Sequence, residues 1–354
     1  MIKSRLFNGI LFSFVVIFSI VLGEYALKLK GVKRFQTWLE MNEKGFVENR
    51  SNFKALGFTT DSTIIYSIDK YGLRETESVI THDSSTKILV LGDSFAFGLY
   101  LKDEDTILHQ LNKETNSSIL FYNGGVGGSG SADQLWNFRK YSSEIKFDEV
   151  IILMNYDDVD RTINQNLFVL ENGKLIESQR YKPTFWYYFI HHSQWHSFLE
   201  KNSRLYFYRS KLFWKYLFFY DDYKFYSEKT KYLWPQVESL YASNEYSTKM
   251  WVKLLELFKN ECESSQIKLK LVTTGTPADS LRNPHTYKIY NQLDSLVHEI
   301  GIPLIDLRTV LLEKSEGDLR KLQLYPDDHP NPKAAKIIAQ EILKVWYRDK
   351  INEK

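Results

Sequence analysis

Short apolar runs alternate with amphipathic stretches over the last three-quarters of the chain. The runs are five to seven residues long and fit buried strands. They fall at residues 87–92, 118–122, 149–154, 267–273 and 302–306. The stretches between and after them have helical periodicity, and they cover residues 105–114, 132–141, 251–263, 287–300 and 332–347. This alternation predicts an α/β fold with a doubly wound, parallel five-stranded sheet between two layers of helices.

The first 23 residues have a different pattern. An uncharged apolar run from Leu6 to Gly23 follows Lys3 and Arg5, and Glu24 ends it. A run of this length is near the lower limit for a membrane-spanning helix, and the absence of a polar face argues against a buried helix of a soluble domain. A cleaved signal peptide is the alternative, because Val21 and Gly23 fit the small-residue positions of a cleavage site. We expect an uncleaved signal anchor over residues 1–23.

Two further regions lie outside the alternating pattern. Residues 24–86 are mixed and polar, and we expect them to form an extension that packs on the α/β domain at residues 87–347. Residues 160–247 interrupt that domain and are rich in aromatic side chains, so we expect a mainly helical insertion there, with a helix at 203–220. We interpret these aromatic residues as a buried wall or as support for a lid. The alternative is that they stack on a sugar.

Composition narrows the classes of function. The 46 basic and 44 acidic residues nearly cancel, so no strong charge would draw the chain to nucleic acid. Cys262 is the one cysteine, which excludes an internal disulfide and argues against a cysteine-based metal site. We expect neither a metal nor an organic cofactor.

Gly92-Asp93-Ser94 follows the first predicted strand of the sheet. A serine at a sharp turn between a strand and a helix presents its hydroxyl at the carboxyl edge of the sheet, where such folds place their sites. The following helix would also supply N–H groups to a developing oxyanion. An ordinary helix N-cap at Asp93 or Ser94 explains the tripeptide equally well.

His329 favours the catalytic interpretation of Ser94. It lies just before the last helix, within Tyr325-Pro-Asp-Asp-His-Pro-Asn331, and has two carboxylates beside it. A serine nucleophile needs a general base, and that base needs an acceptor for its other ring nitrogen. Asp327 or Asp328 would reach back to His329 if the loop curls.

These motifs resemble those of the GDSL/SGNH hydrolase superfamily. Gly92-Asp93-Ser94-Phe95 is similar to the first family block, with Phe95 in a place where leucine is commoner. Asn123-Gly-Gly-Val-Gly-Gly128 is similar to the second block, and Asp327-Asp328-His329-Pro330-Asn331 to the fifth. Asp69-Lys-Tyr-Gly-Leu-Arg74 resembles a segment that often precedes the fold in anchored bacterial members. The resemblance implies the flavodoxin-like SGNH fold, with Ser94 as nucleophile, His329 as base and Gly128 as an oxyanion donor.

The chain departs from the family pattern in two places. The third block normally carries an asparagine that donates to the oxyanion, but Asp157 occupies that position here, and Asn155 precedes it by two residues. An ionised Asp157 would repel an oxyanion, so three alternatives are open. Asn155 substitutes as donor, because alternate residues of a strand share a face, or Asp157 is protonated, or the activity is reduced. In the fifth block Pro326 stands where the family acid is usual, so an Asp-x-His spacing selects Asp327, with Asp328 as the alternative.

The resemblance implies an acyl-ester hydrolase or O-acyltransferase that acts on acyl esters, such as O-acetyl groups, of a cell-surface glycan. It also implies a single-pass protein of the bacterial cytoplasmic membrane with a periplasmic catalytic domain. The four basic residues after the apolar run would by themselves favour a cytoplasmic domain, although large domains cross largely regardless of charge. A non-catalytic glycan-binding module is the main alternative, and the replaced asparagine supports it. A phosphatase-like use of Asp93 lacks the metal ligands or phosphate loop that it would need.

Overall fold

The computed structural model describes residues 2–31, 38–58, 63–76, 85–115, 118–155, 158, 161, 167–177, 195, 198–199, 202–206, 245–273, 284–324 and 329–349. Two compact units divide the chain. One comprises Met1–Thr37, Ala55–Thr63 and Thr184–Pro235, and the other comprises Trp38–Lys54, Ile64–Pro183 and Gln236–Lys354. The second unit contains the sheet.

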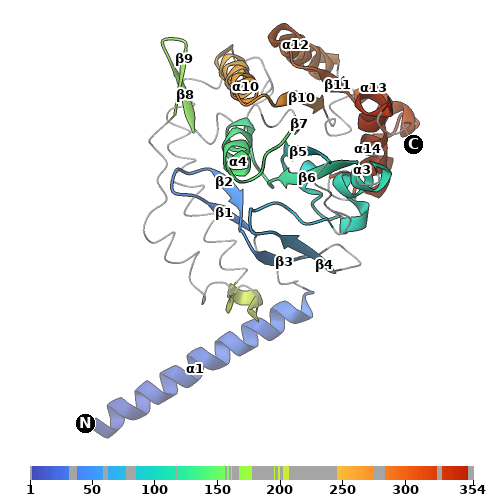
Figure 1. The fold of residues 1–354 in the computed structure, drawn as a ribbon. Helices are drawn as coiled ribbons and strands as arrows, with labels where there is room; N and C mark the ends of the chain where they lie inside the picture. The colour runs from blue at the N-terminus through green and yellow to red at the C-terminus, as the bar shows by residue number, and fades with distance from the viewer. Residues whose placement is uncertain are drawn as a thin grey trace. The chain divides into compact units, whose positions relative to one another are not determined.

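A parallel sheet of five strands forms the centre of the second unit (Figure 1). Its order is β11-β10-β7-β5-β6, and each neighbouring pair is parallel. The strands are β5 (Thr86–Gly92), β6 (Ile119–Gly125), β7 (Glu149–Met154), β10 (Lys268–Thr273) and β11 (Leu304–Asp306). The predicted doubly wound sheet is confirmed, and each of its strands overlaps a predicted run.

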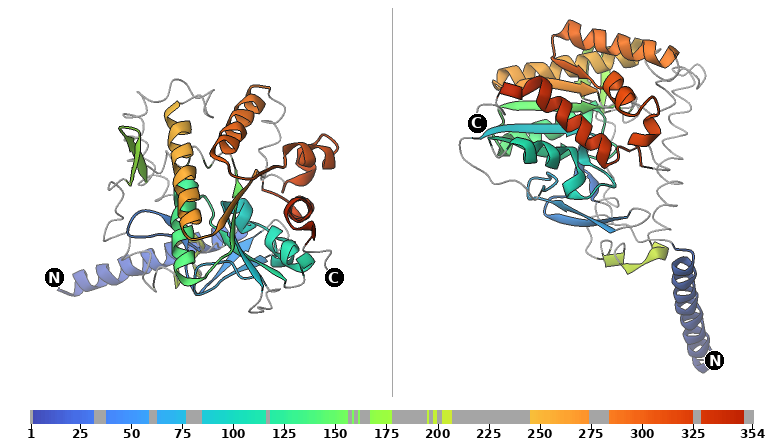
Figure 2. Two further views of the ribbon diagram at one scale, coloured as in Figure 1. Left: turned by 45° about the horizontal axis from the view of Figure 1, so that its top comes forward. Right: turned by 90° about the vertical axis from the view of Figure 1, so that its right-hand side faces the viewer.

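Helices cover both faces of this sheet (Figure 2). One layer contains α4 (Ser131–Glu144), α10 (Glu245–Ser264) and α12 (Pro284–Ile300). The other contains α3 (Ile107–Thr115), α13 (Arg308–Lys314), the 3₁₀ helix η4 (Leu319–Leu322) and α14 (Pro332–Trp346). Both layers are needed because the strands are apolar on both faces.

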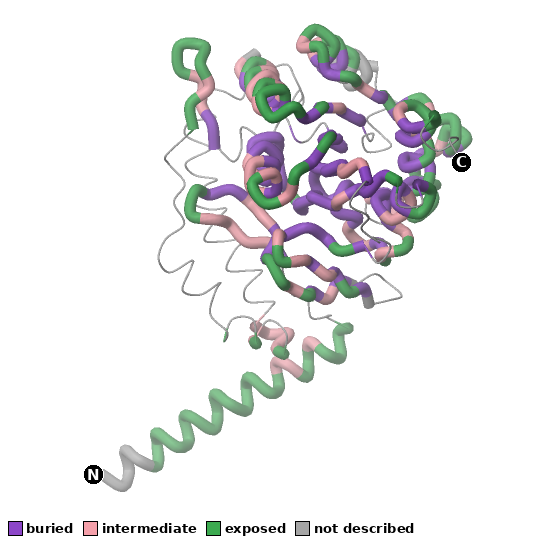
Figure 3. Tube along the Cα trace, viewed as in Figure 1, coloured by how far each residue is buried: buried purple, intermediate pink, exposed green. Residues whose placement is uncertain are grey.

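Successive residues of each strand enter different cores. Leu89 and Leu91 of β5 pack in the cluster under α4 and α10, whereas Ile88 and Val90 pack in the cluster under α3 and α14. All four side chains have no exposed surface. The central strands are therefore buried along most of their length (Figure 3).

Residues 38–76 contain strands that the sequence pattern did not predict. They are β1 (Leu39–Met41) and β2 (Val47–Asn49), which pair antiparallel, and β3 (Phe53–Phe58) and β4 (Thr63–Ile68). In β4 the buried residues alternate, as in Ile64, Tyr66 and Ile68. Ile65 between them is apolar but exposed, which hides the alternation from sequence analysis.

A β-hairpin lies within the region predicted to be a mainly helical insertion. β8 (Phe168–Glu171) and β9 (Lys174–Glu177) pair antiparallel, with Glu171 opposite Lys174. Asn172 and Gly173 between them have positive φ angles of 52° and 76°. Asn-Gly is the usual sequence of such a two-residue turn, so a signal for the hairpin was present. Residues 204–206 are helical, and the rest of the helix predicted at 203–220 lies largely outside the described residues.

The N-terminal helix α1 (Ile2–Leu29) contains the apolar run. Its segment Phe7–Leu29 is long and apolar enough to cross a membrane, and none of that segment is buried by the protein. A signal sequence would have the same properties, so the helix is consistent with both interpretations of the N-terminus.

Candidate active site

Ser94 lies where β5 turns into the short helix α2 (Ser94–Phe97). Gly92 at the end of the strand has φ of 152°, and a Cβ there would lie 2.6 Å from the carbonyl oxygen of Leu153. Only glycine fits so tight an approach. Asp93 is the N-cap, and its Oδ1 accepts from the Phe95 N–H at 2.8 Å. The turn therefore holds Ser94, which is 7% exposed, at the carboxyl edge of the sheet.

His329 contacts this serine from the far end of the chain. Its Nε2 lies 2.7 Å from Ser94 Oγ, a hydrogen-bond distance, although 235 residues separate them. The His329 carbonyl accepts from Leu324 N–H at 2.8 Å, and Asn331 then caps α14 by accepting from Ala334 N–H at 3.0 Å. The backbone at His329 and just after it is thus fixed by hydrogen bonds.

Two aromatic rings contact the imidazole of His329. The ring of Phe95 lies 5.1 Å from it, centroid to centroid, and the ring of Tyr100 meets it edge-on at 5.4 Å. Both distances are in the range of favourable aromatic contacts. The aromatic residue at position 95, where the family commonly has leucine, therefore packs against the candidate base.

The glycine-rich loop after β6 lies against the end of β5. Val126 N–H and Ser129 Oγ both donate to the Gly92 carbonyl, at 3.0 and 3.1 Å. Gly128 has φ of 72°, and a Cβ at this position would meet nothing within 4 Å. The sheet thus places the candidate oxyanion loop beside the candidate nucleophile.

The remaining predicted site residues are only partly described. Asn155 directly follows β7, is 4% exposed and donates its N–H to Asp158 Oδ2 at 3.3 Å. Asp157, Asp327 and Asp328 lie outside the described residues. Two predictions from the sequence therefore stay predictions. One is Asn155 or Asp157 as the third oxyanion group, and the other is Asp327 or Asp328 as the acceptor for His329.

A buried group of charges behind Ser94 was not predicted. The second carboxylate oxygen of Asp93 pairs with Arg161 Nη1 at 2.7 Å, and the same nitrogen lies 3.3 Å from Asp158 Oδ1. Both carboxyl side chains have no exposed surface. Gln134 Nε2 also donates to Asp158, at 2.9 Å. Arg161 lies three residues after Asp158, but sequence alone gave no sign that either residue would meet Asp93.

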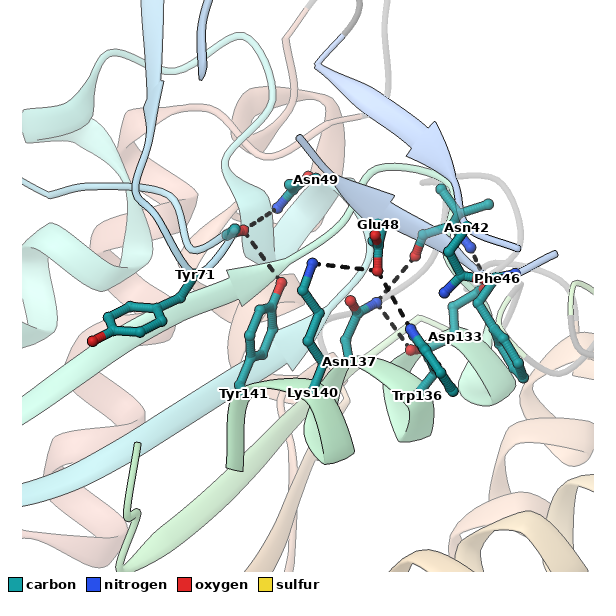
Figure 4. Close-up of polar contacts among 12 residues, drawn as sticks. Asn42, Phe46, Glu48, Asn49, Tyr71, Asp133, Trp136, Asn137, Lys140 and Tyr141 are labelled. Carbon is teal, nitrogen blue, oxygen red and sulfur yellow. Dashed lines mark hydrogen bonds and ion pairs between the residues drawn. The ribbon is translucent and has the colours of Figure 1, made fainter. Parts of the chain in front are cut away.

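The segment at residues 38–54 supports the glycine loop from outside the sheet. Asn49 Nδ2 donates to the carbonyls of Gly72 and Gly125, both at 3.0 Å. Asp133 at the start of α4 accepts from Val47 N–H at 2.8 Å and from Gly130 N–H at 3.0 Å. Figure 4 shows the contacts of Asn49, Asp133 and their neighbours on α4. The loop that contains Gly128 is therefore held at both ends by this polar network.

Arg74 contacts the turn that follows α2. It donates through Nη1 to the carbonyls of Phe97 and Gly98, both at 2.8 Å, and through Nη2 to that of Leu101 at 3.0 Å. Its guanidinium pairs with Asp103 at 2.5 Å, and its side chain has no exposed surface. The segment Asp69–Arg74, which the sequence marked only by resemblance, is thus in direct contact with the polypeptide around the candidate nucleophile.

No family model matches the chain, and no curated protein matches it. Solved structures do. A lipolytic protein of the G-D-S-L family from Veillonella parvula is 14% identical, with a TM-score of 0.42, and the match covers 75% of this chain and all of that one. An acetylxylan esterase from Geobacillus stearothermophilus is 13% identical, with a TM-score of 0.43 and coverage of 78% and 98%. The esterase EstA from Pseudoalteromonas is 13% identical, with a TM-score of 0.41 and coverage of 73% and 96%.

The similar structures include members of the family that the sequence motifs resemble.

Proposed function

We propose that this chain is a serine-dependent acyl-ester hydrolase or O-acyltransferase of the SGNH type, with Ser94 as nucleophile and His329 as general base. The observation that carries the proposal is the 2.7 Å contact between His329 Nε2 and Ser94 Oγ at the carboxyl edge of a parallel sheet. An imidazole at this distance is in reach of the hydroxyl proton that it must remove.

The proposed reaction has two acyl-transfer steps. His329 takes the Ser94 proton as Oγ attacks the ester carbonyl, and a tetrahedral intermediate forms. That intermediate collapses as the C–O bond of the ester breaks, and His329 gives its proton to the departing alcohol. Water, or a hydroxyl of a sugar acceptor, then attacks the acyl-serine carbonyl and gives its proton to His329. The second intermediate collapses as the bond between the acyl carbon and Ser94 Oγ breaks, and His329 returns the proton to Ser94. The first acceptor gives hydrolysis and the second gives transfer.

The developing oxyanion needs donors. We assign this role to the backbone N–H groups of Ser94 and Gly128, with Asn155, or Asp157 in its protonated form, as the third donor. The loop contacts that hold Val126 and Ser129 to Gly92 support the placement of Gly128. Removing one oxyanion donor typically lowers the rate by about a hundred- to a thousandfold, so the replaced asparagine predicts a slower enzyme with the same chemistry.

The imidazole also needs an acceptor for its Nδ1 proton. We assign this role to Asp327, with Asp328 as the alternative, because each is close enough in sequence to reach back to His329. The carboxylate would hold the tautomer in which Nε2 accepts the serine proton.

We propose O-acetyl or other acyl esters of a cell-surface glycan as substrates, and a single-pass anchor that places the catalytic domain in the periplasm. The family resemblance and the apolar exposed helix α1 support this placement. One of the similar structures is an acetylxylan esterase, so a member of the same fold class acts on an acetylated polysaccharide.

Ester hydrolysis by purified full-length protein tests the proposal. With p-nitrophenyl acetate and an acetylated sugar, Ser94→Ala and His329→Ala should each lower kcat by on the order of 10⁴-fold or more, because each removes a group of one catalytic unit. Ser143→Ala and His298→Ala are matched controls, since Ser143 caps an exposed turn of α4 and His298 lies in the last turn of α12. Full activity of Ser94→Ala would refute the assignment.

A further inference from the structure

Tyr100 has an unusual backbone conformation beside the candidate base. Its φ is 65°, in the left-handed region that side-chain-bearing residues seldom occupy. The position is otherwise suited to glycine, so its tyrosine needs an explanation. Such outliers persist where the surrounding structure holds them, often at functional sites.

The contact that the Tyr100 side chain makes with the candidate base explains why a tyrosine occupies this position. Its ring meets the His329 imidazole edge-on, at 5.4 Å between centroids and 85° between planes. Phe95 packs on the same imidazole at 5.1 Å. Two aromatic contacts therefore restrict the ring rotation of His329, whose Nε2 must stay within hydrogen-bond reach of Ser94 Oγ.

Buried groups hold the turn from which Tyr100 reaches His329. Tyr66 Oη accepts from the Tyr100 N–H at 2.9 Å, and Tyr66 has no exposed surface. Burial raises the pKa of Tyr66 to about 12, so the acceptor stays a neutral hydroxyl at ordinary pH. Arg74 binds the carbonyls of Gly98 and Leu101, on both sides of Tyr100.

Arg74 and Tyr66 also contact each other. The guanidinium carbon of Arg74 lies 4.8 Å from the centre of the Tyr66 ring and 5.0 Å from that of Phe97 in α2. The same two side chains thus support the nucleophile's helix and the turn after it. A shift of this turn would move Tyr100 relative to Ser94 and His329.

We propose that Tyr100 is a positioning residue that holds the His329 imidazole against Ser94, from a turn fixed by Arg74 and Tyr66. The catalytic consequence rests on the proposed function, whereas the contact between the rings does not. The contact that the structure shows is between the two rings.

The test compares Tyr100→Gly, which keeps the backbone conformation and loses the ring, with Tyr100→Phe, which keeps the ring. Tyr100→Gly should lower kcat for p-nitrophenyl acetate by about 10- to 100-fold and leave KM within about twofold, because a misplaced group slows the chemical step. Tyr100→Phe should stay within about twofold of wild type in both. Gln266→Gly makes the same backbone change at a remote turn with φ of 58° and should change neither.

NMR of the His329 ring protons gives a readout that does not need turnover. The nearby Tyr100 ring shifts these signals, so Tyr100→Gly should move and broaden them, and Tyr100→Phe should leave them near the wild-type positions. Unchanged signals in Tyr100→Gly, or an equal loss of kcat in Tyr100→Phe, would overturn the proposal. If wild-type protein lacks esterase activity but the ring signals move as expected, the function fails while the positioning contact stands.

Discussion

Two carboxyl groups lie fully buried behind Ser94 and share one arginine. Asp93 pairs with Arg161 at 2.7 Å and Asp158 lies 3.3 Å from the same nitrogen. Burial, and then the neighbouring Asp93, raises the pKa of Asp158 well above its ordinary value of 3.8. One guanidinium faces two buried acids, so keeping Asp158 protonated avoids a second buried negative charge.

This arrangement predicts a pH dependence of stability. Between the ordinary and the raised pKa, the folded protein holds a proton on Asp158 that the unfolded chain has lost. The free energy of unfolding therefore falls as pH rises through that range. Asp158→Asn should remove this decline and be at least as stable as wild type at neutral pH, since the amide oxygen can still accept from Gln134.

Urea unfolding of both proteins from about pH 4 to about pH 8 measures this effect. Asp349→Asn is the control, because Asp349 is exposed near the C-terminus and should leave the pH profile unchanged. If Asp158→Asn instead loses most stability at the higher pH, then Asp158 is ionised and its ion pair with Arg161 stabilises the fold.

At the scale of helices and strands, the hydrophobic pattern along the chain predicts the five-stranded sheet well. It does not predict the short strands β1 and β2. β7 begins and ends where its apolar run does, at Glu149 and Met154, because both faces of a central strand are buried and the run has no polar interruption. β1 and β2 have only three residues each and depend on contacts with α4, such as that between Asp133 and Val47. Periodicity cannot detect strands this short.

The residues of the candidate site were also only partly predictable from the sequence. Ser94 and His329 were identified because each lies in a short motif, and the structure places them in contact. Arg161 and Tyr100 were missed because their importance comes from contacts with residues distant in sequence, or from a backbone angle. Nothing in the sequence around Tyr100 indicates a left-handed conformation, which for a tyrosine is uncommon.

Helix α1 is the element whose role is tested most simply. Its apolar side chains are exposed, as in Phe12 at 71% and Phe14 at 64%. Glu24, which ends the apolar run, accepts from the N–H groups of Arg204 and Leu205 at 3.0 and 2.9 Å. These hydrogen bonds hold α1 to residues 204–205, which belong to the same compact unit.

An uncleaved anchor predicts that C-terminally tagged protein stays with bacterial membranes after an alkaline carbonate wash and has the mass of the full chain. Insertion of the apolar segment into lipid is the physical reason. Removal of residues 1–23 should release the protein into the soluble fraction. A tagged wild-type protein that is soluble and shorter by that segment would show that the helix is a cleaved signal peptide.

At the scale of the whole molecule, the candidate site is assembled from segments throughout the chain. Arg74, the turn at residues 92–101, the glycine loop and His329 meet only when the sheet and its helices are complete. The proposed reactivity of Ser94 would therefore require the folded protein, and a serine in an unfolded or merely glycan-binding chain would lack it.

Labelling with a fluorophosphonate tests the activated serine most directly. Ser94 Oγ would bond to phosphorus, fluoride would leave, and His329 would take the proton. Full-length protein should gain one adduct, mapped by mass spectrometry to Ser94, while Ser94→Ala gains none, His329→Ala reacts far more slowly and Ser143→Ala reacts like wild type. Folded wild-type protein that stays unlabelled, or that is labelled equally in Ser94→Ala, would contradict a catalytic Ser94 and favour a glycan-binding module.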